Sequence, residues 1–264
     1  MGSFPQSIVH YLPVTDHDER WGIVCTTAGY QNVPPGSPYP LTQHPDSYSF
    51  TRSRGRVLGE YQLLYIVSGQ GEFRSASSPA VPVKAGTVVM LFPDEWHTYA
   101  PDPETGWEEW WVGFRGENID RRVAEGFFSP KTPLLHIGHS AGIVSCYQEI
   151  IRSAEEERKG FQQLVTGIVL HLLGSVLFKR DNLQYLDNPI VEKINRAREM
   201  MRRHIGDNLP PEEIARRLNI GYTWFRRTFR AYVGIAPAQY QLQLRHNKAR
   251  ELLTTTDRTV SEIA

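Results

Sequence analysis

The stretch Leu218-Asn-Ile-Gly-Tyr-Thr-Trp-Phe-Arg-Arg-Thr-Phe-Arg230 decides how the last third of the chain folds. Before it, residues 210–217 begin with prolines and acidic residues, which favour the first turn of a short helix. Asn219-Ile220-Gly221 supplies a turn, and residues 222–232 have the periodicity of a second helix. Two helices joined by so tight a turn predict a helix-turn-helix.

The predicted second helix has an apolar side and a polar side. Ala215 is small where the two helices approach, and the wedge between them is built from Leu218, Ile220, Phe225 and Phe229. An arginine fork donates two hydrogen bonds to a guanine edge or clamps a phosphate, which suits a helix lying in the major groove of DNA. An ordinary helical hairpin with solvated arginines is the alternative. The candidate DNA-binding residues are Tyr222, Thr223, Arg226, Arg227 and Arg230.

The surrounding sequence predicts an all-α domain over residues 188–264. Asn188-Pro189 is a good helix start, and Gly234 and Pro237 mark a helix stop and the next helix start. This part holds fourteen Lys or Arg against eight Asp or Glu, whereas residues 1–187 hold fifteen against twenty-one. A basic C-terminal part on an acidic body indicates that only the C-terminal part meets a polyanion.

Residues 1–116 are predicted to form a β-rich domain. Short runs of β-branched and aromatic residues, such as 61–67, 87–92 and 107–114, alternate with Gly- and Pro-rich turns. Closely spaced short strands of this kind favour a sandwich or barrel. Residues 61–67 and 72–74 are predicted to form a hairpin, with Gly69 and Gly71 in its turn.

Helical periodicity replaces the β pattern over residues 117–180. The predicted helices are 117–128, 140–158 and 161–180, and the short polar segment 181–187 is the predicted linker. The longest apolar run, 167–178, is too short to span a membrane and is interpreted as a buried helix. Cys25 and Cys146 form no CxxC pair, and the N-terminus shows no secretory signal, so a cytoplasmic protein is expected.

The helix-turn-helix stretch resembles the first such unit of the AraC/XylS family of transcriptional regulators. The resemblance continues through Gly234-Ile-Ala-Pro-Ala-Gln-Tyr240 and Val260-Ser-Glu-Ile-Ala264. It implies that Thr223, Arg226 and Arg227 face DNA bases. Gly221 and Thr228 depart from the family's usual serine and large aliphatic residue. The family carries two such units, so the chain is expected to hold the first unit and the connecting helix and to stop as the second begins.

The N-terminal part resembles the same family's sensor domain. The matching stretches are Leu64-Tyr-Ile-Val-Ser-Gly-Gln-Gly71, Lys84–Pro93, Trp96-His-Thr-Tyr99 and Trp107-Glu-Glu-Trp-Trp-Val-Gly-Phe114. The resemblance implies a cupin-like ligand-binding barrel over 1–116, followed by a helical dimerisation segment over 117–180. The expected fold class is therefore α+β, with a helix-turn-helix domain after the barrel and its helices.

Four residues offer the groups that a sugar-sized polar ligand needs. Arg54, Tyr99, Glu109 and Trp111 supply a donor fork, a hydroxyl, a carboxylate acceptor and an aromatic face. By the resemblance, they match positions lining the arabinose pocket of the family's namesake, where Glu109 replaces a histidine. The alternative is that Trp111 is a core residue and Glu109 a surface carboxylate. Further candidates are His44, Tyr48, Phe50, Arg56 and Trp96.

A cupin-type enzyme, or a binding module without DNA regulation, is the alternative function. Metal-dependent cupins use a His-x-His pair, but His97-Thr98-Tyr99 lacks the second histidine. No nucleophile elbow, phosphate-binding loop or dinucleotide fingerprint is present in the sequence. We therefore expect no catalytic residues, metal or cofactor. The expected partners are an operator in double-stranded DNA, a small polar effector such as a sugar, and a second copy of the chain, with no membrane.

Overall fold

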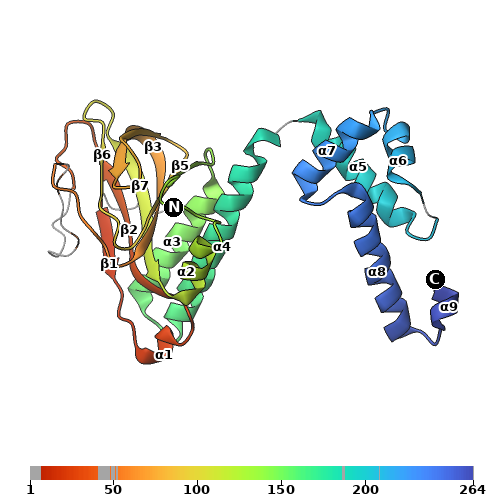
Figure 1. The fold of residues 1–264 in the computed structure, drawn as a ribbon. Helices are drawn as coiled ribbons and strands as arrows, with labels where there is room; N and C mark the ends of the chain where they lie inside the picture. The colour runs from red at the N-terminus through yellow and green to blue at the C-terminus, as the bar shows by residue number, and fades with distance from the viewer. Residues whose placement is uncertain are drawn as a thin grey trace. The chain divides into compact units, whose positions relative to one another are not determined.

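The computed structural model describes residues 7–40, 48, 51, 53–185, 188–207 and 209–263 (Figure 1). Contacts divide the chain into two compact units, residues 1–183 and residues 184–264. We call the first the barrel unit and the second the helical unit. Each is described by itself.

The barrel unit is built on one antiparallel sheet that curls around an interior. The strands follow the order β1-β2-β7-β3-β5-β8, and β4 and β6 also pair with β3. The bounds are β1 Ser7–Tyr11, β2 Val24–Val33, β3 Tyr61–Ser75, β4 Val81–Lys84, β5 Thr87–Leu91, β6 His97–Pro101, β7 Trp107–Arg115 and β8 Leu134–His136. The fold class is α+β, as the sequence predicted.

The hairpin predicted within residues 61–74 is wrong, because this segment forms the single strand β3. Gly69 has a φ of +79°, and the register with β7 shifts between Ile66 and Ser68. The strand therefore bends without reversing. Its first half pairs with β5, and its second half pairs with β4 and β6. The glycine-rich sequence thus bends one long strand around the barrel.

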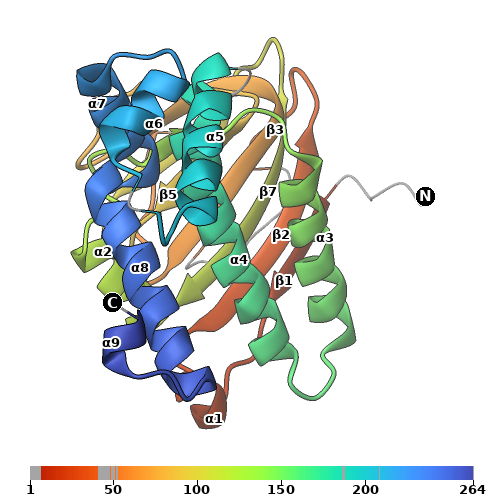
Figure 2. The ribbon, with the colours of Figure 1, turned by 90° about the vertical axis from the view of Figure 1, so that its right-hand side faces the viewer.

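Two long helices cover one face of the sheet (Figure 2). They are α3 (Ala141–Glu156) and α4 (Phe161–Asn182), and both contact β2. The short α1 (Asp16–Glu19) and α2 (Glu117–Ala124) lie at the ends of strands, and a 3₁₀ turn, Leu183–Tyr185, follows α4. The predicted helix 117–128 ends early, since Gly126 has a positive φ of 80°. Among the described residues, α4 is the one helix long and apolar enough to cross a membrane.

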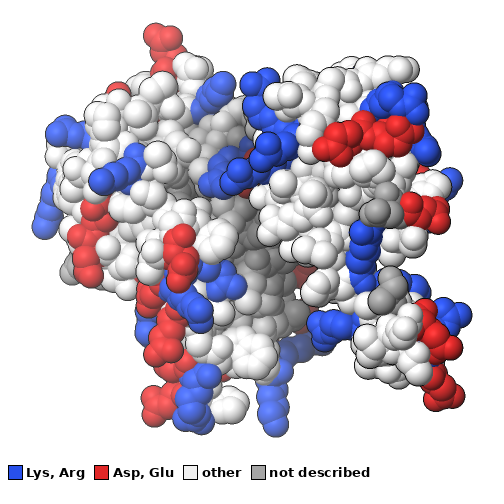
Figure 3. Space-filling view, turned by 45° about the vertical axis from the view of Figure 1, so that its right-hand side comes forward, with Lys and Arg blue, Asp and Glu red and all other residues white. Residues whose placement is uncertain are grey.

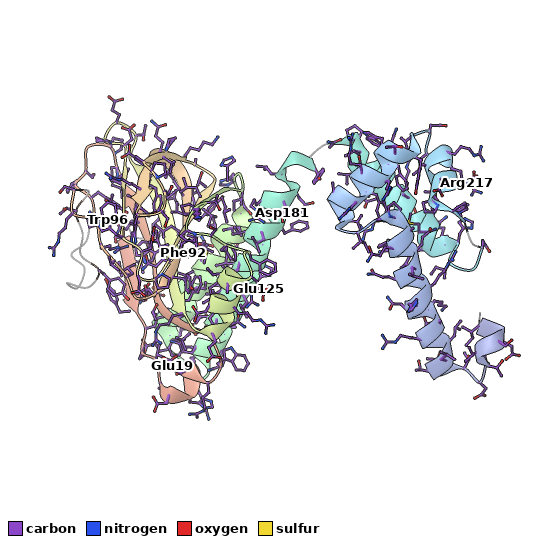
Figure 4. The ribbon with its side chains drawn as sticks, in the orientation of Figure 1. Glu19, Phe92, Trp96, Glu125, Asp181 and Arg217 are labelled. Atoms are coloured by element: carbon purple, nitrogen blue, oxygen red, sulfur yellow. The ribbon has the colours of Figure 1, made fainter. Side chains whose placement is uncertain are left out.

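The barrel unit has two apolar cores, one on each side of the sheet. The outer core lies between the sheet and the two long helices and contains Trp110, Tyr147 and Val169. The inner core fills the barrel and contains Leu64, Phe73 and Trp107. Figure 4 shows Phe92 toward the helices and Trp96 on the opposite side of the barrel.

The described part of the helical unit contains five helices, and the first four pack around a small core. They are α5 Pro189–Arg203, α6 Pro211–Arg217, α7 Tyr222–Val233, α8 Pro237–Thr255 and α9 Val260–Ile263. The predicted start of α5 is confirmed, because the Asn188 side chain accepts a hydrogen bond from the Ile190 N–H at 3.0 Å. Ile194, Ala197 and Met201 are buried together against α6 and α7.

The turn between α6 and α7 confirms the helix-turn-helix. Asn219 has a φ of +53°, a left-handed conformation that asparagine tolerates better than most residues. The next residue, Ile220, returns its N–H to the Ala215 carbonyl at 3.1 Å. Phe225 and Phe229 are buried and contact each other edge to face, so they form the expected wedge.

Gln162 joins α4 to a bulge in β2 and gives a test of this packing. Its amide oxygen accepts from the Cys25 N–H at 3.0 Å, and its amide nitrogen donates to the carbonyls of Pro13 and Cys25, both at 2.9 Å. The two Cys25 groups lie where the β2–β7 register shifts, between Cys25 and Thr27, and the Pro13 carbonyl lies before α1. The buried side chain therefore satisfies polar atoms that the sheet leaves unpaired.

We expect Gln162→Leu to lower the free energy of unfolding by about 3 kcal/mol, because buried backbone groups lose their partners. Urea unfolding followed by tryptophan fluorescence measures this loss. The matched control is Gln163→Leu, since the side chain of the neighbouring Gln163 donates to the exposed Asp18, at 2.9 Å, and not to backbone groups of the sheet. Equal stability of the two variants would contradict the role of Gln162.

Candidate functional site

A small closed pocket lies inside the barrel unit, between strands and the segment that follows β2. Its cavity volume is about 20 Å³, which is room for a water molecule and no more. Most of its lining is polar or aromatic. We call it the barrel pocket, and it is lined by Val9, Tyr11, Thr27, Gln31, Tyr39, Pro40, Tyr48, Arg56, Gln62, Tyr99, Glu109 and Trp111.

Strand β7 supplies two of these residues through the alternation of its side chains. Glu109 and Trp111 are two residues apart and both reach the barrel pocket, whereas Trp110 between them enters the outer core. The structure therefore places Glu109 and Trp111 on the same side, as the sequence predicted. Glu109 is 2% exposed and is not a surface carboxylate.

The Trp111 indole lies directly against Gly29 of β2. A Cβ atom at Gly29 would come within 2.1 Å of the indole ring, so any larger residue would displace Trp111. Gly29 and Trp111 are paired in the β2–β7 register. The glycine thus makes room for a flat aromatic surface at the wall of the pocket.

Glu109 is a buried carboxyl group with one oxygen engaged. The Tyr39 hydroxyl donates to Oε1 at 2.8 Å, while Oε2 has no hydrogen-bond partner among the described residues. Burial raises the pKa of Glu109 to about 7, against the opposing effects of the Tyr39 hydrogen bond and the Arg56 charge. The Trp107 N–H lies near enough to lower this pKa, but outside hydrogen-bond geometry.

Arg56 organises the polar side of the pocket. Its Nη2 donates to the Tyr99 hydroxyl at 2.7 Å and to Gln62 Oε1 at 3.4 Å. Its Nη1 donates to the Tyr48 carbonyl at 2.7 Å, and its Nε donates to His97 Nε2 at 3.3 Å. The guanidinium is therefore held in a fixed orientation beside Tyr99.

His97 belongs to this network as a neutral acceptor. Its Nδ1 lies 3.0 Å from the Glu95 carbonyl, which assigns the proton to Nδ1 and leaves Nε2 to accept from Arg56. Burial, aided by the Arg56 charge, lowers the pKa of His97 to about 4. Both ring nitrogens are thus engaged. No group of three or more metal-ligating side chains occurs among the described residues.

Glu60 is a second buried carboxylate beside the pocket. It accepts hydrogen bonds from Gln62 Nε2 at 2.8 Å, from Tyr48 at 3.0 Å and from Thr27 at 3.4 Å. Three donors at a 4% exposed carboxylate offset the cost of burying it. This network also positions Gln62, whose amide reaches both Glu60 and Arg56.

The structure does not place Arg54 or Trp96 in the barrel pocket. Arg54 is exposed in a turn that ends at Gly55, and Arg56 takes the inward position by bridging to His97. The Trp96 indole donates to the Arg54 carbonyl at 3.0 Å and lies beside the Arg74 guanidinium on the outside (Figure 4). His44 and Phe50 lie outside the described residues. Of the first four candidates, the structure brings Tyr99, Glu109 and Trp111 together.

The sequence reasoning missed Tyr39, Gln31 and Gln62. A signal for Gln62 existed, because it interrupts the buried apolar run at the start of β3. Gln31 carried no such signal, because β2 also contains Thr26, Thr27 and Asn32. No pattern identified Tyr39, which reaches the pocket from the segment between β2 and β3. Its position depends on tertiary folding.

The second candidate site is the exposed side of α7 in the helical unit. Thr223, Arg226, Arg227 and Arg230 are exposed and follow each other at helical spacing, so they share one face. Tyr222 is half-buried and packs on the core. Trp224, which the sequence reasoning did not select, is 37% exposed in the first turn. On α6, by contrast, Arg216 and Arg217 are paired with Glu213 at 2.7 and 2.9 Å.

The surface charge does not single out one basic patch. Figure 3 shows Lys and Arg interspersed with Asp and Glu over the visible faces of both units. Figure 4 labels Arg217 on α6 of the helical unit. A candidate nucleic-acid interface therefore rests on the geometry of α7 rather than on charge alone.

A barrel with a closed polar pocket, joined to a helix-turn-helix unit, defines a class of sensor proteins that bind DNA. Comparison with protein families agrees. The AraC-like ligand binding domain matches residues 35–173, and a helix-turn-helix domain matches residues 214–264. The chain belongs to the AraC/XylS family of transcriptional regulators.

Curated relatives carry the names of operon regulators. The Msm operon regulatory protein of Streptococcus mutans is 22% identical over 79% of this chain and 75% of its own length. The raffinose operon transcriptional regulatory protein RafR of Pediococcus pentosaceus is 22% identical over 82% and 79%. The MmsAB operon regulatory protein of Pseudomonas aeruginosa is 25% identical over 77% and 66%. The chain is a ligand-responsive, DNA-binding transcriptional regulator and not an enzyme.

Solved structures with similarity to the chain include a cupin family protein from Methanocaldococcus jannaschii and ToxT from Vibrio cholerae. The first is 14% identical with a TM-score of 0.29 and covers 45% of this chain and 93% of that one. The second, described with a bound unsaturated fatty acid, is 12% identical with a TM-score of 0.31. The match covers 100% of this chain and 87% of the ToxT chain.

The raised pKa of Glu109 predicts how stability changes with pH. The folded state holds the proton with a pKa of about 7, above the ordinary value of 4.5. The stabilisation from this proton is fully present below pH 4.5 and is lost as the pH rises through 7. Relative to Glu109→Gln, which cannot titrate, the wild type should lose about 3 kcal/mol of its free energy of unfolding between pH 4.5 and pH 8.

Urea unfolding of both proteins at pH 4.5, 6.5 and 8 measures this difference. Glu108→Gln is the matched control, because Glu108 is the adjacent residue of β7 and does not line the barrel pocket. Glu108→Gln retains Glu109, so its stability should still fall as the pH rises through 7. A constant difference between Glu109→Gln and the wild type would show that Glu109 is not the titrating group.

Proposed function

We propose that the chain senses a sugar or a related small polar metabolite in the barrel pocket and reads an operator with the exposed face of α7. We further propose that it acts as a homodimer in the cytoplasm, where an operator is accessible. The observation that carries the effector proposal is the convergence of Glu109, Arg56 and Gln62 around the Trp111 indole.

The chemistry of the barrel pocket supports a hydroxyl-rich effector. Glu109 accepts hydrogen bonds, Arg56 donates them, and the Gln62 amide can do both. An aromatic wall such as Trp111 suits the apolar face of a sugar ring. One relative of the chain is named for a raffinose operon, which favours the same class of effector.

The geometry of α7 supports direct contact with base pairs. Three exposed arginines within five residues, at positions 226, 227 and 230, give the helix several donor forks on one side. The α7 helix begins after a tight turn and has its apolar side fixed by Phe225 and Phe229. Its polar side is therefore held in one orientation, as a helix that enters the major groove requires.

The exposed side of α4 supports a homodimer. Leu164 is 52% exposed and Phe178 is 68% exposed, and Gly167, His171 and Gly174 follow the same side at spacings of three and four. Such a stripe is the seam of a coiled coil, and glycines in it allow two helices to approach closely. Leu164 and Phe178 each lie two turns from His171. An antiparallel pair centred on His171 places Leu164 of one copy against Phe178 of the other.

Effector binding controls DNA binding only through a difference in affinity between two arrangements of the protein. The expected coupling is about 1–3 kcal/mol, which corresponds to a change of roughly 5- to 150-fold in operator affinity. Raffinose and its component monosaccharides are the first effectors to test.

The DNA-binding proposal predicts the behaviour of Arg226→Ala. Binding sites are first selected by the wild type from a randomised duplex library, and affinities are then measured by fluorescence anisotropy at fixed salt. Removing a base-contacting arginine should weaken binding to the selected sites by about 10-fold or more, since such a contact is worth about 1–3 kcal/mol. Arg152→Ala on α3 makes the same change of charge in the other unit and should bind as the wild type does.

The same assay with raffinose, galactose, glucose or fructose at millimolar concentration tests the effector proposal. At least one of these sugars should change wild-type operator affinity within the stated range. The proposal fails if Arg226→Ala retains full affinity, or if no sugar changes binding.

The dimer proposal predicts that Phe178→Asp makes the chain monomeric. A charge placed in the seam on each copy is desolvated without a partner, which opposes association. Sedimentation equilibrium of the full chain measures the dissociation constant, which should rise at least about 100-fold by the cost of burying unpaired charges. Val57→Asp is the control, because Val57 is 51% exposed and follows Arg56, whose backbone pairs with His97 of β6 and not with α4. A monomeric wild type would refute the dimer.

A further inference from the structure

Tyr39 closes the barrel pocket from the segment between β2 and β3. Its hydroxyl donates to Glu109 Oε1 at 2.8 Å. The centre of its ring lies 5.7 Å from the centre of the Trp107 ring and 6.1 Å from the centre of the Tyr99 ring. The Tyr39 residue is partly exposed, whereas Glu109 is 2% exposed. The side chain therefore spans from the surface to the buried carboxyl group and fills the space between them.

The chemistry of this contact is that of a bound sugar. Tyr39 presents a six-membered ring between aromatic side chains and places a hydroxyl group on a buried carboxylate. The Tyr39 ring meets Trp107 edge-on, at 88° between the ring planes. A pyranose ring offers hydroxyl donors in the same way and is of similar size. It also offers a second hydroxyl beside the first. Glu109 Oε2, which has no hydrogen-bond partner among the described residues, is positioned to accept it.

The barrel pocket is too small for an effector, so a side chain that lines it must move before an effector enters. The cavity of about 20 Å³ admits water but not a sugar ring. Tyr39 belongs to a connecting segment, and its ring can leave without breaking a strand pair of the sheet. Trp111, Tyr99 and Gln62, by contrast, lie within strands and are buried. Displacement of Tyr39 therefore disturbs the sheet less than displacement of Trp111, Tyr99 or Gln62 would.

We propose that Tyr39 occupies the effector position in the free protein, so that a pyranose must displace it to reach Glu109, and that Glu109 selects neutral sugars over sugar acids. This inference rests on the proposed sugar-sensing function. It specifies the class of sugar that binds and names Tyr39 as the side chain that competes with it. The effector ring replaces the Tyr39 ring against Trp107 and Tyr99. Two adjacent hydroxyls of the effector then donate to the two oxygens of Glu109.

The charges around the barrel pocket support this selection. Glu109 and Glu60 are both buried on its polar side, and the Arg56 guanidinium already donates to Tyr99, Gln62, His97 and the Tyr48 carbonyl. Above pH 7, where Glu109 is mostly ionised, a ligand carboxylate at Glu109 would face a like charge in a site with little water. A neutral hydroxyl donates to the same carboxylate without this cost.

Displacement of an internal competitor lowers the apparent affinity for the effector. The apparent dissociation constant equals the intrinsic one divided by the fraction of molecules in which Tyr39 has left the pocket. Removing the Tyr39 hydroxyl takes away its bond to Glu109 and should raise effector affinity about 10-fold, the ratio expected for one hydrogen bond to a charged group. Removing the whole ring should raise it at least as much.

Isothermal titration calorimetry of the full chain at pH 8, where Glu109 is mostly ionised, tests both parts of the proposal. The proteins are the wild type, Tyr39→Phe, Tyr39→Ala and Glu109→Gln. The probes are galactose, glucose and mannose, each paired with its uronic acid at equal concentration. Tyr61→Phe is the matched control, because the Tyr61 hydroxyl also donates to a carboxylate, Asp120 at 2.9 Å, and Tyr61 does not line the barrel pocket.

We expect at least one neutral hexose to bind Tyr39→Phe and Tyr39→Ala about 10-fold more tightly than it binds the wild type or Tyr61→Phe. The matching uronic acid should bind the wild type at least about 10-fold more weakly than the hexose does. Glu109→Gln should reduce this preference, because it removes the repulsive charge. A hexose that binds Tyr39→Ala but not the wild type also supports displacement, because the pocket is then accessible only when the Tyr39 ring is absent.

Three results would overturn the inference. If a hexose binds the wild type and both Tyr39 variants with equal affinity, displacement is wrong while sugar sensing stands. If the uronic acid binds the wild type more tightly than its hexose, selection by Glu109 is wrong. If no probe binds any of these proteins, including Tyr39→Ala, this inference and the proposed sugar sensing both fail.

Discussion

Strand β7 is buried on both faces, and the organisation of the barrel unit depends on this constraint. Its outward residues, such as Trp110 and Val112, join the core under α3 and α4, while Glu109 and Trp111 point into the barrel pocket. A carboxyl group placed on the inner face has no access to bulk water, so its hydrogen bonds must come from other segments. Tyr39 supplies one of them, and the pKa of Glu109 rises because the compensation is incomplete.

The polar network around Arg56 gives the interior its specificity. Arg56 links Tyr99, Gln62 and His97, and Gln62 in turn links Arg56 to Glu60. Such a network in a medium of low dielectric constant is stable only when its members are satisfied together. It therefore fixes side-chain orientations more strictly than apolar packing would. A site with fixed donors and acceptors is what recognition of a small polar molecule requires.

The two units separate the tasks of the regulator. The barrel unit holds a closed polar pocket and a helix with an apolar exposed side, and the helical unit holds a fixed polar helix face. Each has its own buried core, so either can respond to its ligand without unfolding the other. Coupling between effector binding and DNA binding requires a difference in affinity between two states of the protein.

The sequence by itself determined the helix-turn-helix, because its turn, wedge and exposed arginines are local and follow helical periodicity. It also determined that Glu109 and Trp111 share a face, since alternation along a strand is a local property. Tertiary structure alone decided that residues 61–75 form one bent strand, because glycines permit a turn or a bend and pairing with β4, β5, β6 and β7 selects the bend. It likewise placed Arg56 rather than Arg54 inside the barrel, and Tyr39 over Glu109. These positions depend on contacts between residues distant in sequence, which no local pattern encodes.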